Sequence, residues 1–231
     1  MMARGFAVRQ LVSLAFFLVI TAQGLHAQCY LHPKLSSGEK TIRSVALLPP
    51  TAQMKAQGPR RYDFKEKEAE QLASALAGVV SNALKKRGWD VNDSAFNSQA
   101  LQDKEELRYL VGYLRARHVM LVQQTKPKDV LKGRYSVRER VAALSAHAPT
   151  DVLVLVHGDV ERFTTGGVIA ATAVGSILYG LGGAITPFFL TGKDVSLRIS
   201  LVDSHSGEIL CFLKVSSSEE EQILKELRKV P

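Results

Sequence analysis

Apolar side chains recur at helical spacing in the first half of the chain. One face of a helix collects Leu72, Leu76, Val79, Val80 and Ala83. Asp63 and Glu66 have the spacing of a capping box, which predicts that this helix begins beside them, and Gly88 suits its end. A second helix is expected over residues 103–124, with a strand over residues 118–123 as the alternative.

In the last third of the chain, apolar residues occupy alternate positions, which is typical of strands with one buried face. Strands are expected at residues 43–48, 89–91, 151–163, 195–201 and 209–215. Pro49 and Pro50 close the first of these strands, because proline cannot continue a ladder. The residues that follow, up to the first helix, are rich in Gln, Gly and Pro and are expected to form a loop.

Two more helices complete the pattern. Ser136 and Glu139 form a second capping box for a short helix before Pro149, and the acidic residues from Glu219 begin a final helix. The predicted fold class is therefore mixed α/β. We expect a small mixed sheet with packing helices, a carboxy-terminal antiparallel meander and a hydrophobic insertion between two strands.

That insertion, residues 164–192, is the strongest feature of the sequence, because it is apolar, rich in glycine and alanine, and uncharged. Its small residues recur every four positions, a spacing that lets helices approach closely in membranes. A hairpin in water does not need so much apolar sequence at its tip. The candidate membrane or partner contacts are Gly167, Ala171, Gly175, Leu178, Tyr179, Gly180, Gly183, Phe188 and Phe189.

Residues 166–185 are long enough to span a bilayer as a helix. Each glycine costs about 1 kcal/mol in a helix in water, so the segment favours helix only in lipid or in a covered groove. A single span would separate strands that we expect to pair. The open alternatives are a hairpin or surface segment at the membrane, a subunit interface, or a loop folded onto its own domain.

The amino terminus indicates export. Arg4 and Arg9 precede an apolar run over residues 11–20, and Ala27 stands where a signal peptidase cuts. Residues 1–27 are therefore predicted to be a signal peptide, residues 28–41 an irregular leader, and residues 42–231 a single α/β domain. The expected location is the periplasm or cell envelope, with outer-membrane association left open.

The net charge limits the classes of partner that the protein is expected to bind. The net charge of +8 becomes +6 when Arg4 and Arg9 leave with the signal peptide. A basic protein can bind nucleic acid, but export argues against that partner and favours anionic lipids or acidic envelope polymers. The glycines at 180–183 lack the remainder of a phosphate-binding motif, and no cofactor is expected. A homo-oligomer or a complex with an envelope protein is the expected state.

Two cysteines, Cys29 and Cys211, remain in the mature chain. An oxidising compartment would permit a disulfide between them. Lipid attachment at Cys29 is disfavoured, because Gln28 and His26 stand where a lipobox has a small residue and leucine. Two free thiols, with Cys211 packed in a strand, are the third alternative.

An alternative function rests on His157, Asp159 and Glu161, which alternate along one strand and share a face. A histidine beside carboxylates could perform acid–base chemistry or hold a metal, as in a small periplasmic hydrolase or metal-dependent enzyme. The favoured interpretation is a solvated strand face with a cross-strand ion pair to Arg198.

Several segments together resemble a group of bacterial envelope proteins. They are residues 44–49, the helix ending at Gly88-Trp89, residues 150–156, and the Leu-Val-Asp-x-x-x-Gly-Glu sequence at 201–208. The chain resembles the α/β module of curli secretion lipoproteins, LpoB-type activators of penicillin-binding proteins, and the amino-terminal domain of the Tol β-propeller protein. The resemblance implies an accessory or assembly protein that acts by self-association, partner binding or membrane contact. It supplies no catalytic residues.

Overall fold

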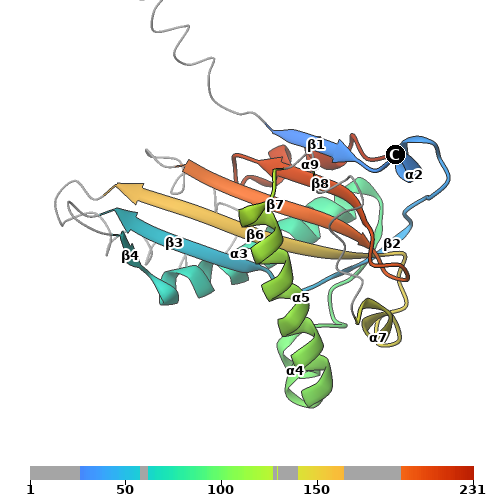
Figure 1. Ribbon diagram of the computed structural model, residues 1–231, viewed down its shortest axis with the longest axis horizontal. Helices are drawn as coiled ribbons and strands as arrows, with labels where there is room; N and C mark the ends of the chain where they lie inside the picture. Colours follow the sequence, from blue (N-terminus) through green and yellow to red (C-terminus); the bar gives the residue numbers. More distant parts are fainter. Residues whose placement is uncertain (1–26, 58–61, 127–128, 130–139, 164–193) are drawn as a thin grey trace, which may run out of the picture.

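The computed structural model describes residues 27–57, 62–126, 129, 140–163 and 194–231 (Figure 1). Within them the strands form one mixed sheet in the order β1-β8-β7-β6-β2-β5, with β3 beside β6 and β4 beside β3. The strands are β1 (Gln28–Leu31), β2 (Ser44–Leu47), β3 (Thr51–Gln57), β4 (Tyr62–Phe64), β5 (Asp90–Asn92), β6 (Val152–Phe163), β7 (Asp194–Asp203) and β8 (Ile209–Val215). The predicted mixed α/β class and the carboxy-terminal antiparallel meander are confirmed.

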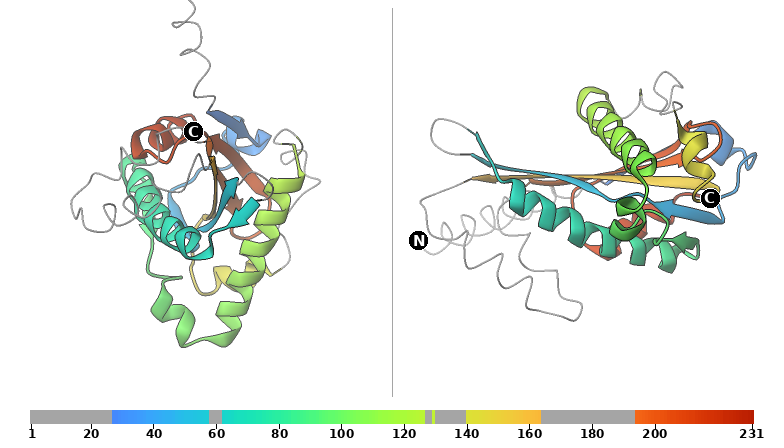
Figure 2. Two further views of the ribbon diagram at one scale, coloured as in Figure 1. Left: turned by 90° about the vertical axis from the view of Figure 1, so that its left-hand side faces the viewer. Right: turned by 90° about the horizontal axis from the view of Figure 1, so that it is seen from below.

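Helices cover both faces of the sheet, which lies edge-on between α3 and α5 in the right-hand view of Figure 2. The described helices are α2 (Pro33–Ser36), α3 (Glu66–Arg87), α4 (Ser98–Gln102), α5 (Glu105–Gln124), α7 (Val141–Ser145) and α9 (Glu220–Leu227). One apolar core lies under α3 and α9, and a second lies under α5 and α7. Because side chains alternate along each strand, β6 supplies Val154 to the first core and Leu155 to the second.

The helix α3 follows the predicted leucine and valine spacing, and Leu72, Leu76 and Val80 are buried. It ends as expected at Gly88, whose φ of +94° suits glycine. The predicted capping box is wrong, because Asp63 belongs to β4 and Lys65 stands at the N-cap without a side-chain cap. The backbone there is already committed to the ladder with β3, so the helix starts after it.

Two segments predicted to be irregular carry strands. Residues 51–57 form β3, which pairs with the second half of β6, whereas β2 pairs with the first half. The strand β2 ends before Pro49 and Pro50, as predicted. Pairing along the same side of β6 then resumes with β3. Residues 28–41 are not irregular throughout, because β1 pairs with β8 and α2 follows it.

The long helix predicted over residues 103–124 is present as α5, with α4 set off before it, and the alternative strand at 118–123 is wrong. Other predictions lie outside the described residues. These are the signal peptide up to residue 26, the capping pair Ser136 and Glu139, and the insertion 164–192. The helix expected after that pair is seen only as α7.

Candidate functional site

The strands β6 and β7 form a long antiparallel ribbon, here called the β6–β7 ribbon. Its register runs from Val152 opposite Asp203 at one end to Glu161 opposite Asp194 at the other. The first of these is called the closed end, because the chain turns from β7 into β8 there. The second is called the open end, because β6 stops and β7 starts there (Figure 1).

All the candidate contact residues from Gly167 to Phe189 lie outside the described residues. The two segments that flank them are described, because β6 ends and β7 begins at the open end of the ribbon. A single crossing of a bilayer would place these two strands on opposite sides, which is incompatible with their pairing. Among the helices that the structure describes, none combines the length and apolar character needed to cross a bilayer.

The hypothetical acid–base face lies toward the open end of the ribbon. His157 is 2% exposed, and its Nδ1 lies 2.8 Å from the hydroxyl of Thr51. Its Nε2 lies 3.3 Å from Oδ1 of Asp159, whose Oδ2 accepts a hydrogen bond from Arg198. Burial opposes ionisation of Asp159, but His157 and Arg198 outweigh it and hold the pKa of this carboxyl below its usual value.

The expected cross-strand ion pair is therefore present, between Arg198 on β7 and Asp159 on β6. The expectation of a solvated face is wrong for His157, because the sheet and α5 enclose it. Of the predicted constellation, the structure brings His157 and Asp159 together, while the side chain of Glu161 lies outside the described part. No metal-binding group of three or more His, Cys, Asp or Glu side chains converges among the described residues.

A second buried histidine lies on α5, within the helix predicted over residues 103–124. His118 of α5 contacts Ser200 of β7, with 2.8 Å between its Nε2 and the hydroxyl oxygen. Burial lowers the pKa of His118 to about 3, and the nearby His157 and Arg198 add to this shift. The imidazole is therefore neutral at neutral pH, and it joins α5 to the middle of the ribbon.

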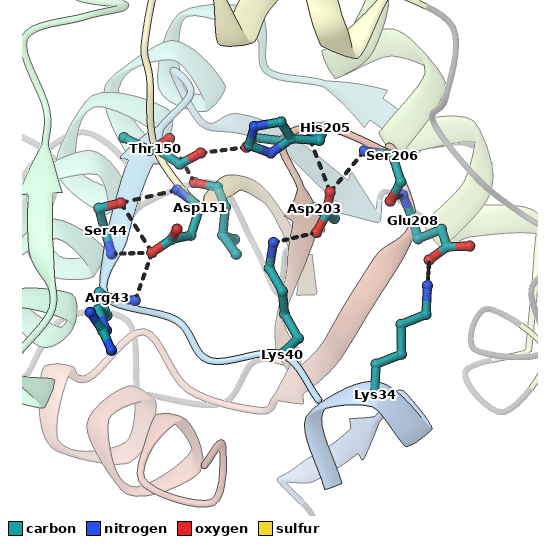
Figure 3. A network of polar contacts seen from close by, with 12 residues as sticks. Lys34, Lys40, Arg43, Ser44, Thr150, Asp151, Asp203, His205, Ser206 and Glu208 are labelled. Carbon is teal, nitrogen blue, oxygen red and sulfur yellow. Dashed lines mark hydrogen bonds and ion pairs between the residues drawn. The ribbon is translucent and has the colours of Figure 1, made fainter. Parts of the chain in front are cut away.

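The closed end is held by a polar network at the turn from β7 to β8 (Figure 3). Asp203 accepts hydrogen bonds from the backbone N–H groups of His205 and Ser206, at 2.9 and 2.8 Å. Its other oxygen lies 2.7 Å from the ammonium of Lys40. Burial opposes ionisation, but Lys40 and the two N–H groups prevail and lower the pKa of Asp203 to about 2.

The same network ties the amino-terminal segment to the ribbon (Figure 3). Asp151 accepts hydrogen bonds from the backbone N–H groups of Arg43 and Ser44, both at 2.9 Å. Lys34 pairs with Glu208 at 2.7 Å. The Leu-Val-Asp-x-x-x-Gly-Glu sequence at 201–208 therefore forms the hairpin turn between β7 and β8. Its Asp203 pairs with Lys40, its Glu208 pairs with Lys34, and Gly207 adopts the positive φ of +69° that the turn requires.

A groove that the sequence did not reveal lies between α3 and the carboxyl ends of β2 and β5, with a volume of about 560 Å³. Ala73, Ala77 and Gly78 of α3 line one wall. Asp93 stands at its rim, 2.7 Å from the Lys85 ammonium, which together with Ser81 lowers the pKa of this carboxyl. Carboxyl ends of parallel strands often hold ligands, and Ser74, Asn82 and Asn97 also line this groove.

Comparison with known proteins gives weak structural similarities. No protein-family model matches the chain, and no curated protein sequence matches it. A PelC dodecamer from Paraburkholderia phytofirmans aligns at 11% identity over 89% of this chain and 97% of that chain, with a TM-score of 0.36. Lipoprotein GNA1162 from Neisseria meningitidis aligns at 16% identity over 74% and 76%, with a TM-score of 0.31.

The C-terminal domain of LpoB from Escherichia coli aligns at 11% identity over 80% of this chain and 91% of that chain, with a TM-score of 0.31. The predicted likeness to LpoB-type proteins is thus confirmed as a weak structural resemblance. Likeness at this level says nothing of activity or partners.

Proposed function

We propose that this protein is an exported, non-enzymatic accessory protein of the bacterial envelope. It acts by contacting a membrane, an envelope protein or a second copy of itself through residues 164–192. The observation that carries the proposal is the pairing of β6 with β7 up to Glu161 and Asp194. Because of this pairing, both ends of the apolar insertion start from the open end of the β6–β7 ribbon.

The described surface at the open end offers the insertion little apolar area to pack against. On the side of α3, Met54, Val160 and Val195 are already buried in the first core. On the opposite side the strands carry polar residues such as Asp159 and Ser196. An insertion of this composition therefore needs a cover from outside the described domain, because exposed apolar surface costs about 25 cal/mol per Å².

One aromatic residue at the same end supports a contact surface there. Phe64 of β4 pairs with Lys55 of β3 and is 55% exposed. The hairpin of β3 and β4 ends on the same side of the molecule as the open end of the ribbon (Figure 1). A partner or bilayer that covers the insertion would lie close to Phe64 and would bury part of this ring.

The test replaces residues 164–192 by Asn-Gly. Glu161 and Asp194 remain paired across a loop of about five residues, a length that hairpins tolerate. The wild-type chain is expected to sediment with membranes or in an assembly after cell fractionation, and the replaced chain is expected in the soluble monomeric fraction. Circular dichroism of both purified chains shows whether the domain remains folded.

A matched control changes the closed end. His205 is exposed, and its imidazole contacts the hydroxyl of the adjacent Ser204. Asp203 binds the backbone N–H of residue 205, which His205→Ala keeps, so this variant should fractionate as the wild type does. The proposal fails if the wild-type chain is itself a soluble monomer. It also fails if the folded replaced chain keeps the wild-type distribution.

A further inference from the structure

The only cysteines of the sequence lie on neighbouring strands at the amino-terminal edge of the sheet. In the pairing of β1 with β8, Cys29 stands opposite Leu213 and Leu31 stands opposite Cys211. Cys211 is two positions from Leu213, so both cysteine side chains project from the same face and are diagonal neighbours. Their thiols are within hydrogen-bonding distance of each other.

The two thiols have different surroundings. Cys211 is fully buried in the core under α3 and α9, whereas Cys29 at the edge is only partly buried. The hydrogen bond from the Cys211 thiol lowers the pKa of Cys29, and the same bond together with burial raises the pKa of Cys211. An oxidant from solvent therefore meets the more acidic and more accessible of the two sulfurs first.

We propose that Cys29 and Cys211 form an intrachain disulfide that fastens the edge strand β1 to β8. The geometric basis is the diagonal, same-face arrangement of the two residues in the β1–β8 pairing, in which the two thiols interact directly. Diagonal neighbours lie about 7–8 Å apart, so bond formation draws β1 slightly closer to β8. The bond also uses the sulfur that a lipid would need, so a disulfide-bonded chain carries no lipid at Cys29.

The oxidant is a disulfide of another molecule, such as an oxidised dithiol oxidoreductase or oxidised glutathione. The Cys29 thiolate attacks one sulfur of that disulfide, and the other sulfur leaves as a thiolate that takes up a proton. The Cys211 thiol then loses its proton and attacks Sγ of Cys29, which releases the second sulfur as a thiol. Two electrons and two protons pass from the protein to the oxidant, and one S–S bond replaces another.

The bond supplies what the edge of the sheet otherwise lacks. The strand β1 covers only Gln28–Leu31 and directly follows the predicted cleavage site after Ala27, and short terminal strands fray. The ion pairs of Lys34 with Glu208 and Lys40 with Asp203 hold the segment after β1 but not β1 itself. A bond from residue 29 to residue 211 also closes a very long loop in the unfolded chain, which restricts it strongly.

The test begins with protein purified under reducing conditions and equilibrated with oxidised glutathione. After unfolding and alkylation, the intact mass is expected to show no alkylated thiol and no glutathione adduct, and digestion should give the Cys29 and Cys211 peptides joined. The oxidised chain should melt about 10 °C above the reduced chain. Cys29→Ser should melt at one temperature with or without reductant.

Two results would overturn the inference: two alkylated thiols after oxidation, or a disulfide found only between chains. Cys211→Ala serves as a second variant, because it also removes the bond but leaves Cys29 in place. The inference goes beyond the proposed function and is tested independently of it. The chain with Asn-Gly in place of residues 164–192 keeps both cysteines, so its oxidation distinguishes a failed disulfide from a failed contact surface.

Discussion

The two ends of the β6–β7 ribbon differ in how their polar groups are used. At the closed end, Asp151 binds the backbone N–H groups of Arg43 and Ser44, and Asp203 pairs with Lys40, so both carboxylates draw the amino-terminal segment to the ribbon (Figure 3). Toward the open end, Asp159 pairs across the ribbon with Arg198, and Lys55 of β3 helps to lower the pKa of this carboxyl. The closed end therefore holds the amino-terminal segment through side-chain contacts, whereas the open end is held by the pairing of β6 with β3 and β7.

The largest effect is expected at the closed end. Asp203→Ala removes two side-chain hydrogen bonds to N–H groups of the turn and leaves Lys40 without its partner. The free energy of unfolding should fall by about 3 kcal/mol, measured by urea denaturation. Asp203→Asn keeps acceptors for the turn and should lose less than half as much. Equal losses for both variants would show that only the charge of Asp203 matters.

The middle of the ribbon should respond to acid. The pKa of His118 is about 3 in the folded chain against 6.5 for a free side chain, so the unfolded chain binds a proton first as pH falls. The contribution of His118 to the free energy of unfolding is therefore fully present above pH 6.5 and is lost progressively toward pH 3. The loss between pH 7 and pH 5 is about 2 kcal/mol. His118→Gln, which keeps a partner for Ser200, should remove most of this slope. Parallel curves for both chains would contradict the assignment.

A smaller effect is expected for the carboxylate toward the open end. Asp159→Ala leaves Arg198 unpaired, but this arginine is partly exposed and water replaces the lost partner. We expect a loss of about 1 kcal/mol in urea denaturation, well below that of Asp203→Ala. The control Asp159→Asn keeps the shape of the site. A loss as large as that at Asp203 would remove the contrast between the two ends.

An effect in the opposite direction is expected from the Asn-Gly replacement of residues 164–192. If the insertion adds no contacts to the domain, a shorter loop reduces the entropic cost of bringing the ends of β6 and β7 together. The replaced chain should then be more stable by about 1 kcal/mol. The measurement is the urea midpoint in detergent-free buffer. A marked loss of stability would instead show that the insertion folds onto its own domain.

The sequence predicted the elements whose pattern is strong. The helix α3 and the meander of β6, β7 and β8 follow from residue spacing alone, and Gly88 marks a helix end by its positive φ. The strands β1, β3 and β4 and the short helices α2 and α4 were missed. The strands β1 and β3 pair with β8 and β6, which are far away in sequence. Local pattern carries no information about such distant partners.

The candidate site was predicted unevenly for the same reason. The cross-strand partner of Asp159 followed from alternation along β6, but the burial of His157 depends on α5, and the contact of His118 with Ser200 joins residues from different elements. The clamp of Asp203 by Lys40 likewise arises only when the amino-terminal segment folds back. The contact residues of the insertion remain a prediction from composition and spacing.

The most direct test of the contact surface places one photoreactive amino acid at Leu178 and, in a second chain, at Ser206 of the closed end. Irradiation of intact cells should attach the Leu178 chain to lipid, to a second copy or to one envelope protein, identified by mass spectrometry, while the Ser206 chain stays unattached. Equal attachment at both positions, or attachment at Ser206 alone, would contradict the account.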